Sequence, residues 1–314
     1  MQIKENVLLA DYTTFKIGGP AIFFAEVESE EELLRALDFA KQNQARVFIL
    51  SGGSNILFSD NGFDGLVILN KINSFLEAKK RVFVNKEKVI VDAGVNLMRF
   101  IEFLAMSELS GFENLYGIPG SIAGAIRGNA GAFGMEIKDK LKRVWALDIE
   151  SGVVKEFKRK DLNFAYRHSF FKDNPQHFIL RAEFEFEKAD SQKTKEQMSY
   201  ILKERNKRQL QNIKSAGSFF KNPVAPKAVV GMFEKEKNTK SKEGRVPAGW
   251  LIDKLGLKGK QIGGAMISKT SANYIINTGF ASSGDVLELA GFIKSKVKDE
   301  FGVVLEEEVV VLKR

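Results

Sequence analysis

The chain has 314 residues, with 48 Lys and Arg, 40 Asp and Glu, two His and no Cys. The lack of cysteine excludes disulfide scaffolds, zinc fingers, iron–sulfur sites and catalytic thiols, and we expect no metal site. Hydrophobic residues at 44% and charged residues at 28% are typical of a globular protein, and the length predicts about two domains. No run reaches the roughly 18 apolar residues of a membrane span, and the first residues lack a signal-peptide pattern. We therefore expect a cytoplasmic protein with no membrane partner.

The charge is unevenly distributed along the chain. Residues 1–70 have a net charge of −5, whereas residues 191–260 have a net charge of +11. A basic region attracts phosphates, carboxylates or nucleic acid, although a solvated lysine-rich surface explains it equally well. The run lacks interleaved aromatic residues and known nucleic-acid-binding patterns, so we expect no nucleic-acid partner.

The first half of the chain predicts alternating helices and strands. Ser29 followed by Glu32 is a capping-box pattern, and the apolar spacing after it predicts a helix over 30–43. A short buried strand is predicted at 47–50, and it leads directly into a glycine turn at 51–55. Further strands are predicted at 66–69 and 88–94 and a further helix at 97–106.

The second half predicts strands first and mainly helices afterwards. Gly256 and Gly302 are placed to end two helices, and Ser282 or Ser283 is placed to begin the second. Trp250 is expected in a core. The predicted elements are strands at 143–149, 153–157, 178–187 and 303–312, the last of them interrupted at Glu306–Glu308, and helices at 191–210, 248–255 and 285–301, with an exposed loop at 234–245.

Two glycine elements are candidates for binding a cofactor. The turn at 51–55 can present bare backbone N–H groups to an anion, although such a turn is often no more than a turn. The stretch 117–134 has six Gly and four Ala in 18 residues, which suits close approach of the backbone to a flat cofactor or to another element. Together they suit a dinucleotide, but neither is a Rossmann fingerprint or a P-loop.

Several motifs in fixed order match one family. They are Thr14–Pro20, Ser51–Asn55, Gly117–Ser121 with Gly128–Gly131, Tyr166–Ser169 with Phe171–Lys172, Ser215–Pro223, Ala248–Asp253, Gln261–Gly264, and Phe301–Leu305 with Glu308–Val309. On these motifs the chain resembles the UDP-N-acetylenolpyruvoylglucosamine reductase (MurB) family over nearly its whole length, in the compact form without a long inserted loop. It departs from the family pattern at Gln211–Lys214 and at Glu307, where relatives often have proline.

The resemblance implies an α+β fold. An FAD-binding unit of the vanillyl-alcohol-oxidase (PCMH) type, residues 1–208 with subdomains of about 1–70 and 71–208, would precede an α+β substrate-binding domain at 209–314. FAD is the implied cofactor and NADPH the implied co-substrate. The chain has no Cys, and neither His168 nor His177 lies in a glycine element, so we expect FAD to be bound non-covalently.

The resemblance also implies a reaction and the residues that perform it. The reaction is the NADPH-dependent reduction of UDP-N-acetylglucosamine enolpyruvate to UDP-N-acetylmuramate for peptidoglycan, with hydride delivered to C3 and a proton to C2. The implied catalytic residues are Ser218 as proton donor, with Arg167 and Glu308 at the substrate carboxylate. The implied cofactor-binding residues are Ser51, Gly52, Gly53, Ser54, Asn55, Gly117, Pro119, Gly120, Ser121, Gly124, Gly128, Asn129, Ala130 and Gly131, and the implied substrate-binding residues are Tyr166, Lys221, Asn222 and Gln261.

Without the resemblance, plainer interpretations of the same residues stay open. Ser218 also suits a turn, Arg167 a strand-end surface, and Glu306–Glu308 a solvated acidic turn. Two other functions are a different FAD oxidoreductase on the same scaffold and a basic binding protein without enzymatic activity. We expect a monomer with a small-molecule sugar-nucleotide substrate.

Overall fold

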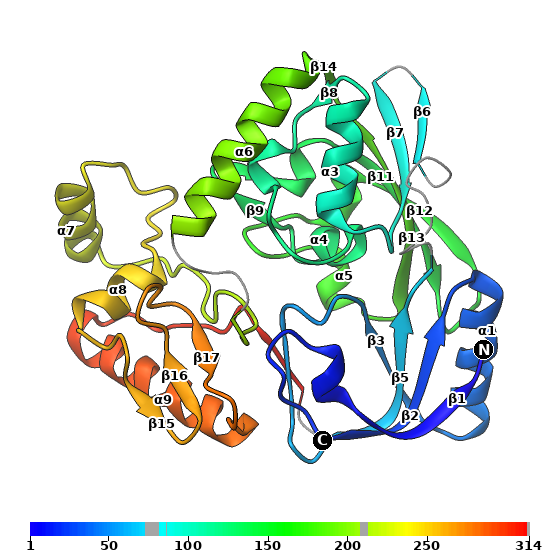
Figure 1. Cartoon of the computed structure of the whole chain (residues 1–314), viewed down its shortest axis with the longest axis horizontal. Coiled ribbons are helices and arrows are strands. Elements are labelled where there is room, and N and C mark those ends of the chain that lie inside the picture. Colours follow the sequence, from blue (N-terminus) through cyan, green and yellow to red (C-terminus); the bar gives the residue numbers. More distant parts are fainter. Residues whose placement is uncertain (73–81, 86, 208–212, 313–314) are drawn as a thin grey trace. The chain divides into compact units, whose positions relative to one another are not determined.

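The computed structural model of the chain describes residues 1–72, 82–85, 87–207 and 213–312. The chain divides into two compact units that are not continuous in sequence (Figure 1). The first contains Met1–Asn6, Ile22–Gly52 and Asp64–Lys207, and the second contains Val7–Ala21, Gly53–Phe63 and Arg208–Arg314. None of the helices among the described residues is long and apolar enough to cross a membrane.

The N-terminal part of the first unit is a sheet with one helix. The strands follow the order β1 (Ile3–Leu8), β2 (Pro20–Val27), β5 (Phe63–Asn70) and β3 (Arg46–Leu50), and β3 and β5 are parallel. Helix α1 (Glu30–Gln42) connects β2 to β3 and packs its apolar stripe, Leu33, Ala36 and Ala40, into the core of this sheet. The predicted helix and strands are therefore confirmed, but only Leu50 of the predicted buried strand 47–50 is fully buried.

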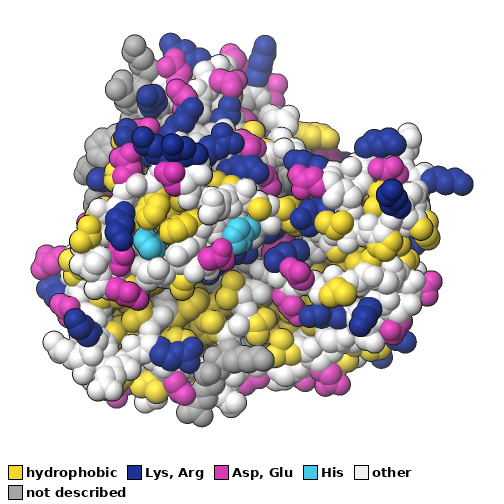
Figure 2. Space-filling model, turned by 180° about the vertical axis from the view of Figure 1, so that it is seen from behind, with side chains coloured by type: hydrophobic (Ala, Val, Ile, Leu, Met, Phe, Trp, Pro, Cys, Tyr) yellow, Lys and Arg dark blue, Asp and Glu magenta, His cyan; other side chains and the backbone are white. Residues whose placement is uncertain are grey.

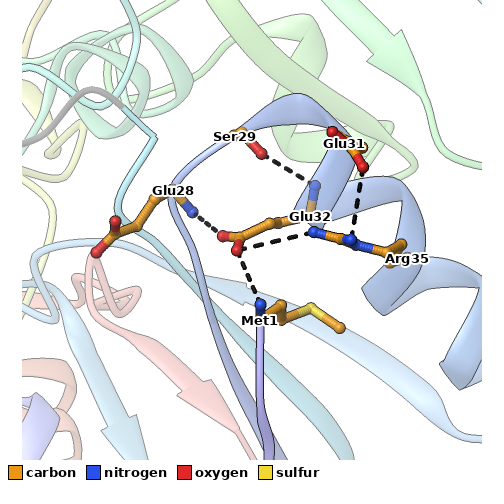
Figure 3. A network of polar contacts seen from close by, with 6 residues as sticks. All are labelled: Met1, Glu28, Ser29, Glu31, Glu32 and Arg35. Carbon is orange, nitrogen blue, oxygen red and sulfur yellow. Dashed lines mark hydrogen bonds and ion pairs between the residues drawn. The ribbon is translucent and has the colours of Figure 1, made fainter.

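The capping of α1 differs from the prediction in one bond (Figure 3). Ser29 is the N-cap, and its Oγ accepts a hydrogen bond from the N–H of Glu32 at 3.1 Å, as predicted. The Glu32 carboxylate accepts from the N–H of Glu28 at 2.8 Å rather than from that of Ser29, and it also pairs with the amino group of Met1 at 2.9 Å. The reciprocal bond of the capping box is thus made one residue earlier than predicted. The separate pair with Met1 ties the N-terminus, which leads into β1, to the start of α1.

The larger part of the first unit is a five-stranded sheet covered by helices. Its order is β12 (Val154–Lys158), β11 (Leu141–Asp148), β13 (His177–Glu185), β7 (Lys88–Asp92) and β6 (Val82–Asn85), and all neighbours are antiparallel. Helices α3 (Leu97–Met106), α4 (Ile122–Arg127) and α6 (Ser191–Lys207) lie on one side of it (Figure 1). Asn96 caps α3, and its Oδ1 accepts the N–H groups of Met98 and Arg99. Shorter elements are β8 (Leu109–Ser110), β9 (Gly131–Ala132), β10 (Met135–Glu136), α5 (Phe170–Asp173) and β14 (Glu187–Lys188).

The second unit has its own core around three helices. Helices α7 (Lys227–Lys237), α8 (Ala248–Lys254) and α9 (Ser283–Phe301) accompany an antiparallel sheet of β15 (Gln261–Ile262), β16 (Ala265–Ile267) and β17 (Ile275–Asn277). A parallel pair, β18 (Val310–Leu312) and β4 (Ile56–Phe58), completes the unit. Trp250 is 7% exposed in this core, as predicted, and packs edge-on against Phe233. Ser282 caps α9, and Gly302 ends it with φ +64°, where glycine is favoured.

One expectation for the second unit is wrong, and another is confirmed only in part. Residues 234–237 form the last turn of α7, because Val229 and Phe233 lie one turn apart and bury the same helix face; the loop begins after them. The strand predicted over 303–312 is interrupted at Glu306–Glu308 as expected, since these residues make single bridging contacts to residues 219–221, but only Val310–Leu312 forms a strand, β18.

The segments Val7–Ala21 and Gly53–Phe63 belong to the second unit although they precede the predicted domain boundary. The side chain of Asn277 donates to the carbonyls of Phe15 at 3.2 Å and Lys16 at 3.3 Å, and Asp60 Oδ2 accepts from the N–H of Ser283 at 2.7 Å. The boundary after residue 208 stays a prediction and lies outside the described residues, as do Gln211 and Asn212.

Candidate functional site

In the first unit the two glycine elements contact each other. The Oγ of Ser51 donates to the Oγ of Ser121 at 2.9 Å, and a Cβ placed on Gly52 would lie 3.2 Å from the Cα of Gly120. Ser121 is also the N-cap of α4, and its Oγ accepts from the N–H of Gly124 at 3.3 Å. Glycine at 52 and 120 thus lets two backbone segments from different parts of the chain meet in one place, as a two-part cradle requires.

Two other glycines of the 117–134 stretch accommodate the protein's own arginines. A Cβ on Gly117, where φ is +85°, would lie 2.7 Å from the Cδ of Arg205. A Cβ on Gly131 would lie 3.2 Å from an Nη of Arg167 and 2.9 Å from the carbonyl oxygen of Met135. The alternative of tight internal packing therefore explains Gly117 and Gly131, whereas Gly124 is exposed and has only the Oγ of Ser121 near its Cβ position.

Asn129 provides the clearest test of whether this stretch suits a ligand. Asn129 is completely buried, and its Nδ2 donates to the carbonyl of Ala165 at 2.9 Å. Its Oδ1 is buried and accepts no hydrogen bond from the described residues. A buried acceptor without a donor is costly, and a ligand N–H or hydroxyl would remove that cost. This unpaired oxygen is therefore the feature of the stretch that fits a bound flavin dinucleotide.

Arg167 occupies a turn that is fastened to this stretch. Its φ is +55°, its Nη2 donates to the carbonyl of Gly131 at 2.9 Å, and its guanidinium lies 5.1 Å from the ring centroid of Tyr166. The backbone of the turn is fixed by Lys172, whose Nζ donates to the carbonyl of Arg167 at 2.7 Å, and by Ser169, whose Oγ donates to the carbonyl of Arg127 at 2.8 Å. Burial lowers the pKa of Arg127. The first unit thus brings together Tyr166, Arg167 and the glycine stretch.

In the second unit, backbone pairing places the segment that contains Ser218 beside the segment that contains Glu308. The N–H of Glu308 donates to the carbonyl of Phe219 at 2.8 Å, and the N–H of Lys221 donates to the carbonyl of Glu306 at 2.9 Å. Phe219 and Phe220 are each 1% exposed and anchor the segment in the core. Two residues 90 positions apart, both predicted to be catalytic, therefore lie on neighbouring extended segments.

The predicted substrate-binding residues of the second unit are arranged differently. Lys221 pairs through Nζ with a carboxylate oxygen of Glu306 at 3.0 Å. The Oδ1 of Asn222 accepts from the N–H of Ala248 at 3.1 Å, at the first residue of α8, so one end of its amide is already occupied. Gln261 lies in the β15–β16 hairpin and donates to the carbonyl of Gly263 at 2.8 Å; no hydrogen bond among the described residues joins it to the Ser218 segment.

The remaining residues of the 51–55 turn, Gly53, Ser54 and Asn55, belong to the second unit. Gly53 has φ +58°, and its Cβ position lies 2.0 Å from the carbonyl oxygen of Tyr12, so only glycine fits. Asn55 approaches the Glu308 segment: its Nδ2 donates to the carbonyl of Glu308 at 3.2 Å, and its carbonyl accepts from Val310 at 3.1 Å.

Two polar residues that support these segments were not predicted from the sequence as parts of the site. Thr14 joins the glycine turn to the serine segment, because its N–H donates to the carbonyl of Gly53 at 3.0 Å and its Oγ1 to that of Ser215 at 2.7 Å. Asn273 is 9% exposed and bonds the backbone of Phe219 and Phe220. Thr14 stands in a family motif, but nothing around Asn273 in the sequence distinguishes it from a turn asparagine.

The basic region 191–260 is neutralised in part by nearby carboxylates. Lys254 and Lys237 both pair with Glu236, at 2.5 and 3.1 Å, and Lys258 pairs with Asp253 at 2.7 Å. On the face shown in Figure 2, Asp and Glu side chains are likewise interspersed among the Lys and Arg side chains. These pairs favour a solvated, ion-paired surface.

Comparison with known proteins places these features in context. Residues 21–158 match the family described as FAD binding domain, and residues 208–312 match the UDP-N-acetylenolpyruvoylglucosamine reductase C-terminal domain. The chain is 40% identical to the UDP-N-acetylenolpyruvoylglucosamine reductase of Carboxydothermus hydrogenoformans over 99% of this chain and 94% of the relative. It is 39% identical to that of Protochlamydia amoebophila over 98% and 93%. The crystal structure of the reductase from Thermus caldophilus superposes with a TM-score of 0.78 at 32% identity, covering 100% of both chains.

Proposed function

Since this chain belongs to the UDP-N-acetylenolpyruvoylglucosamine reductase family, we propose that it reduces UDP-N-acetylglucosamine enolpyruvate to UDP-N-acetylmuramate with electrons from NADPH. The protein is a flavin oxidoreductase with the α+β fold of the vanillyl-alcohol-oxidase type, and FAD is its cofactor. We propose NADPH as the electron donor and a role for each of the site residues given below. We also propose that FAD is bound non-covalently and that the protein is monomeric and cytoplasmic.

The observation that carries the proposed mechanism is the pairing of the Ser218 and Glu308 segments. The reduction adds a hydride at C3 of the enolpyruvyl group and a proton at C2, so it needs one proton donor and a stabilised carboxylate. When bound, FAD would supply the hydride, with NADPH as the proposed source of its electrons. Ser218 is half-buried; it follows Gly217, at φ +80°, and precedes two buried phenylalanines.

The proposed roles follow from the chemistry of each side chain. Ser218 gives its proton to C2. Arg167 stabilises the negative charge that spreads into the substrate carboxylate, because its planar guanidinium matches a carboxylate with two parallel hydrogen bonds. Glu308 acts at the same carboxylate. Tyr166, Lys221, Asn222 and Gln261 bind the rest of the sugar nucleotide.

FAD is proposed to bind along the glycine elements. Ser51, Gly52, Gly120 and Ser121 offer a narrow, polar backbone surface, and the Oδ1 of Asn129 offers a buried acceptor. Gly53, Ser54 and Asn55, which follow Gly52 in the same turn, are proposed to bind FAD as well. The other proposed contacts come from the same glycine stretch: Gly117, Pro119, Gly124, Gly128, Ala130 and Gly131.

The test separates the two halves of the reaction for the Ser218→Ala variant. We expect NADPH to reduce its flavin at the wild-type rate, and we expect the enolpyruvyl sugar nucleotide to reoxidise it about 10³-fold more slowly, the usual scale of a lost proton donor. Stopped-flow absorbance of the flavin measures both rates. Equal reoxidation rates in variant and wild type would reject Ser218 as the donor. If the enolpyruvyl sugar nucleotide does not reoxidise the reduced flavin of the wild-type protein, the proposed function is wrong.

A further inference from the structure

A buried amide holds the serine segment of the second unit in place. The Oδ1 of Asn273 accepts from the N–H of Phe220 at 3.0 Å, and its Nδ2 donates to the carbonyl of Phe220 at 2.8 Å. One side chain therefore makes both hydrogen bonds of a single backbone residue. Its own carbonyl accepts from the N–H of Phe219 at 2.7 Å.

The Asn273 side chain makes the two hydrogen bonds that a continued neighbouring strand would make. Ser218 pairs with Tyr274 in antiparallel fashion, so a continued ladder would pair Phe220 with Ala272. The chain turns away at that point, because the N–H of Tyr274 donates to the carbonyl of Ser271 at 3.0 Å. A buried peptide group without partners is costly, and the Asn273 side chain supplies the two bonds that the backbone does not.

The opposite side of the same segment carries Glu308. The carbonyl of Phe219 accepts from Glu308, while its N–H donates to Asn273, so Phe219 and Phe220 are held from both sides. In an extended segment, a shift of one residue turns each side chain to the other face. Fixing Phe220 therefore fixes the face on which Ser218 lies and its register relative to Glu308.

We propose that Asn273 is a positioning residue that sets the register of Ser218 against Glu308 and thereby the geometry of proton delivery. The inference rests on the proposed function of Ser218. Asn273 itself does not touch the reacting atoms; it acts through the backbone of Phe219 and Phe220. Since a displacement of about 1 Å can cost a reaction about 100-fold, loss of this clamp affects the proton step strongly.

The Asn273→Asp variant tests the proposal with little change of shape. A carboxylate still accepts the N–H of Phe220, but it faces the carbonyl of Phe220 with a second acceptor, and that contact is repulsive. Asn277→Asp is a matched control. Asn277 is 8% exposed, and its amide also bonds only backbone groups, but these belong to Phe15, Lys16, Gly279 and Ala281, not to residues 218–221.

Both variants are purified with FAD, and the two half-reactions are followed separately by stopped flow. For Asn273→Asp we expect reduction by NADPH within about twofold of wild type, reoxidation by the enolpyruvyl sugar nucleotide slowed about 100-fold at saturating substrate, and a larger solvent deuterium isotope effect on that step. For Asn277→Asp we expect wild-type rates in both halves even where its melting temperature falls.

The outcomes distinguish this inference from the function beneath it. Wild-type protein that fails to pass electrons to the sugar nucleotide defeats the proposed function. Wild-type transfer together with unimpaired reoxidation and an unchanged isotope effect in Asn273→Asp overturns the role of Asn273 alone. If Asn273→Asp does not retain FAD, Asn273→Ala, which removes both hydrogen bonds without adding a second acceptor, replaces it. Failure of both variants to fold overturns the proposal in favour of a purely structural role.

Discussion

The glycine stretch of the first unit and the serine segment of the second differ in how they are built, because one is proposed to bind a cofactor and the other to position a proton donor. The stretch at 117–131 is rich in Gly and Ala and holds one buried oxygen, Oδ1 of Asn129, that has no hydrogen-bond partner among the described residues. The segment at 218–221 does the reverse: it buries Phe219 and Phe220 and is paired on both sides. A cofactor that stays bound can be held by many weak backbone contacts, whereas a proton must be delivered from one atom in one place.

This difference predicts different sensitivities to substitution. In the first region, and in the turn 51–55 whose Gly52 packs against Gly120, a single added methyl group should matter only where backbone already fills the space. In the second region a substitution that preserves volume but removes one hydrogen bond should be damaging. The predictions below test that contrast.

The largest effect is expected at Gly53. Alanine there would need a left-handed backbone at φ +58° and would bring its Cβ to 2.0 Å from the carbonyl oxygen of Tyr12. We expect Gly53→Ala to lower the free energy of unfolding by about 3 kcal/mol and to abolish FAD retention, because the turn must rearrange. Denaturant unfolding and flavin absorbance measure the two effects.

Gly52→Ala is the matched control in the same turn. Its Cβ would lie 3.2 Å from the Cα of Gly120 and its backbone needs no unusual φ, so a loss of only about 1 kcal/mol is expected. Equal losses in the two variants would show that the turn responds to side-chain volume in general and not to backbone conformation.

The second prediction concerns Arg167. Arg167→Lys keeps the charge but loses the planar fork, and we expect the kcat/KM for the sugar nucleotide to fall about 30-fold with the rate of flavin reduction by NADPH unchanged. The control is Arg181→Lys, which alters another arginine over an aromatic ring, 5.2 Å from Trp145, and should leave both rates unchanged. A fall in flavin reduction equal to the fall in kcat/KM would contradict a role at the substrate carboxylate.

The sequence predicted helices well where their ends carry local signals. Helix α3 spans Leu97–Met106, as the apolar spacing indicated, and Ser282 and Gly302 bound α9 as expected. Helix α7 was missed because its start, Pro226, carries no side-chain cap and its lysine-rich end resembles a loop, although Val229 and Phe233 are spaced for one helix face. Helix ends that carry capping residues, like those of α3 and α9, can therefore be recognised from sequence alone, whereas an uncapped start like that of α7 cannot.

The site was predictable only in part, and the reason is sequence separation. The glycine stretch is unusual in composition and was recognised from the residues alone, but the contact of Ser51 with Ser121 was not. Ser218 and Glu308 came from family resemblance, since neither stands out by itself. Asn273 could not be predicted, because its role depends on a strand that ends beside Phe220, and this break appears only in three dimensions.

The third prediction concerns Thr14, which links Gly53 of the glycine turn to Ser215 of the serine segment in the second unit. The Oγ1 of Thr14 donates to the carbonyl of Ser215 at 2.7 Å, three residues before Ser218. We expect Thr14→Val, which preserves shape, to lower the free energy of unfolding by about 1 kcal/mol and to slow substrate-driven flavin reoxidation about fivefold. Thr14→Ser keeps the hydroxyl and should retain most of both. If valine and serine behave alike, the hydroxyl is not the link.

The smallest effect is expected on the ion-paired surface of the second unit, where position is not fixed by backbone pairing. Hydrogen bonds from Lys254, and then from Lys237, lower the pKa of Glu236 from 4.5 to about 2. A lowered folded-state pKa stabilises the fold above the unfolded value, so the contribution is complete above about pH 4.5 and is lost as the pH falls towards 2. Urea unfolding of wild type and Glu236→Gln between pH 5.5 and 2.5 should therefore show a small stability difference that disappears towards the acid end. Glu243→Gln, which removes a longer contact of 3.7 Å to Arg245, is the matched control and should change the free energy of unfolding little at pH 5.5. A Glu236→Gln difference that grows with acid would reverse the sign and show that this carboxylate is not stabilised by its lysines.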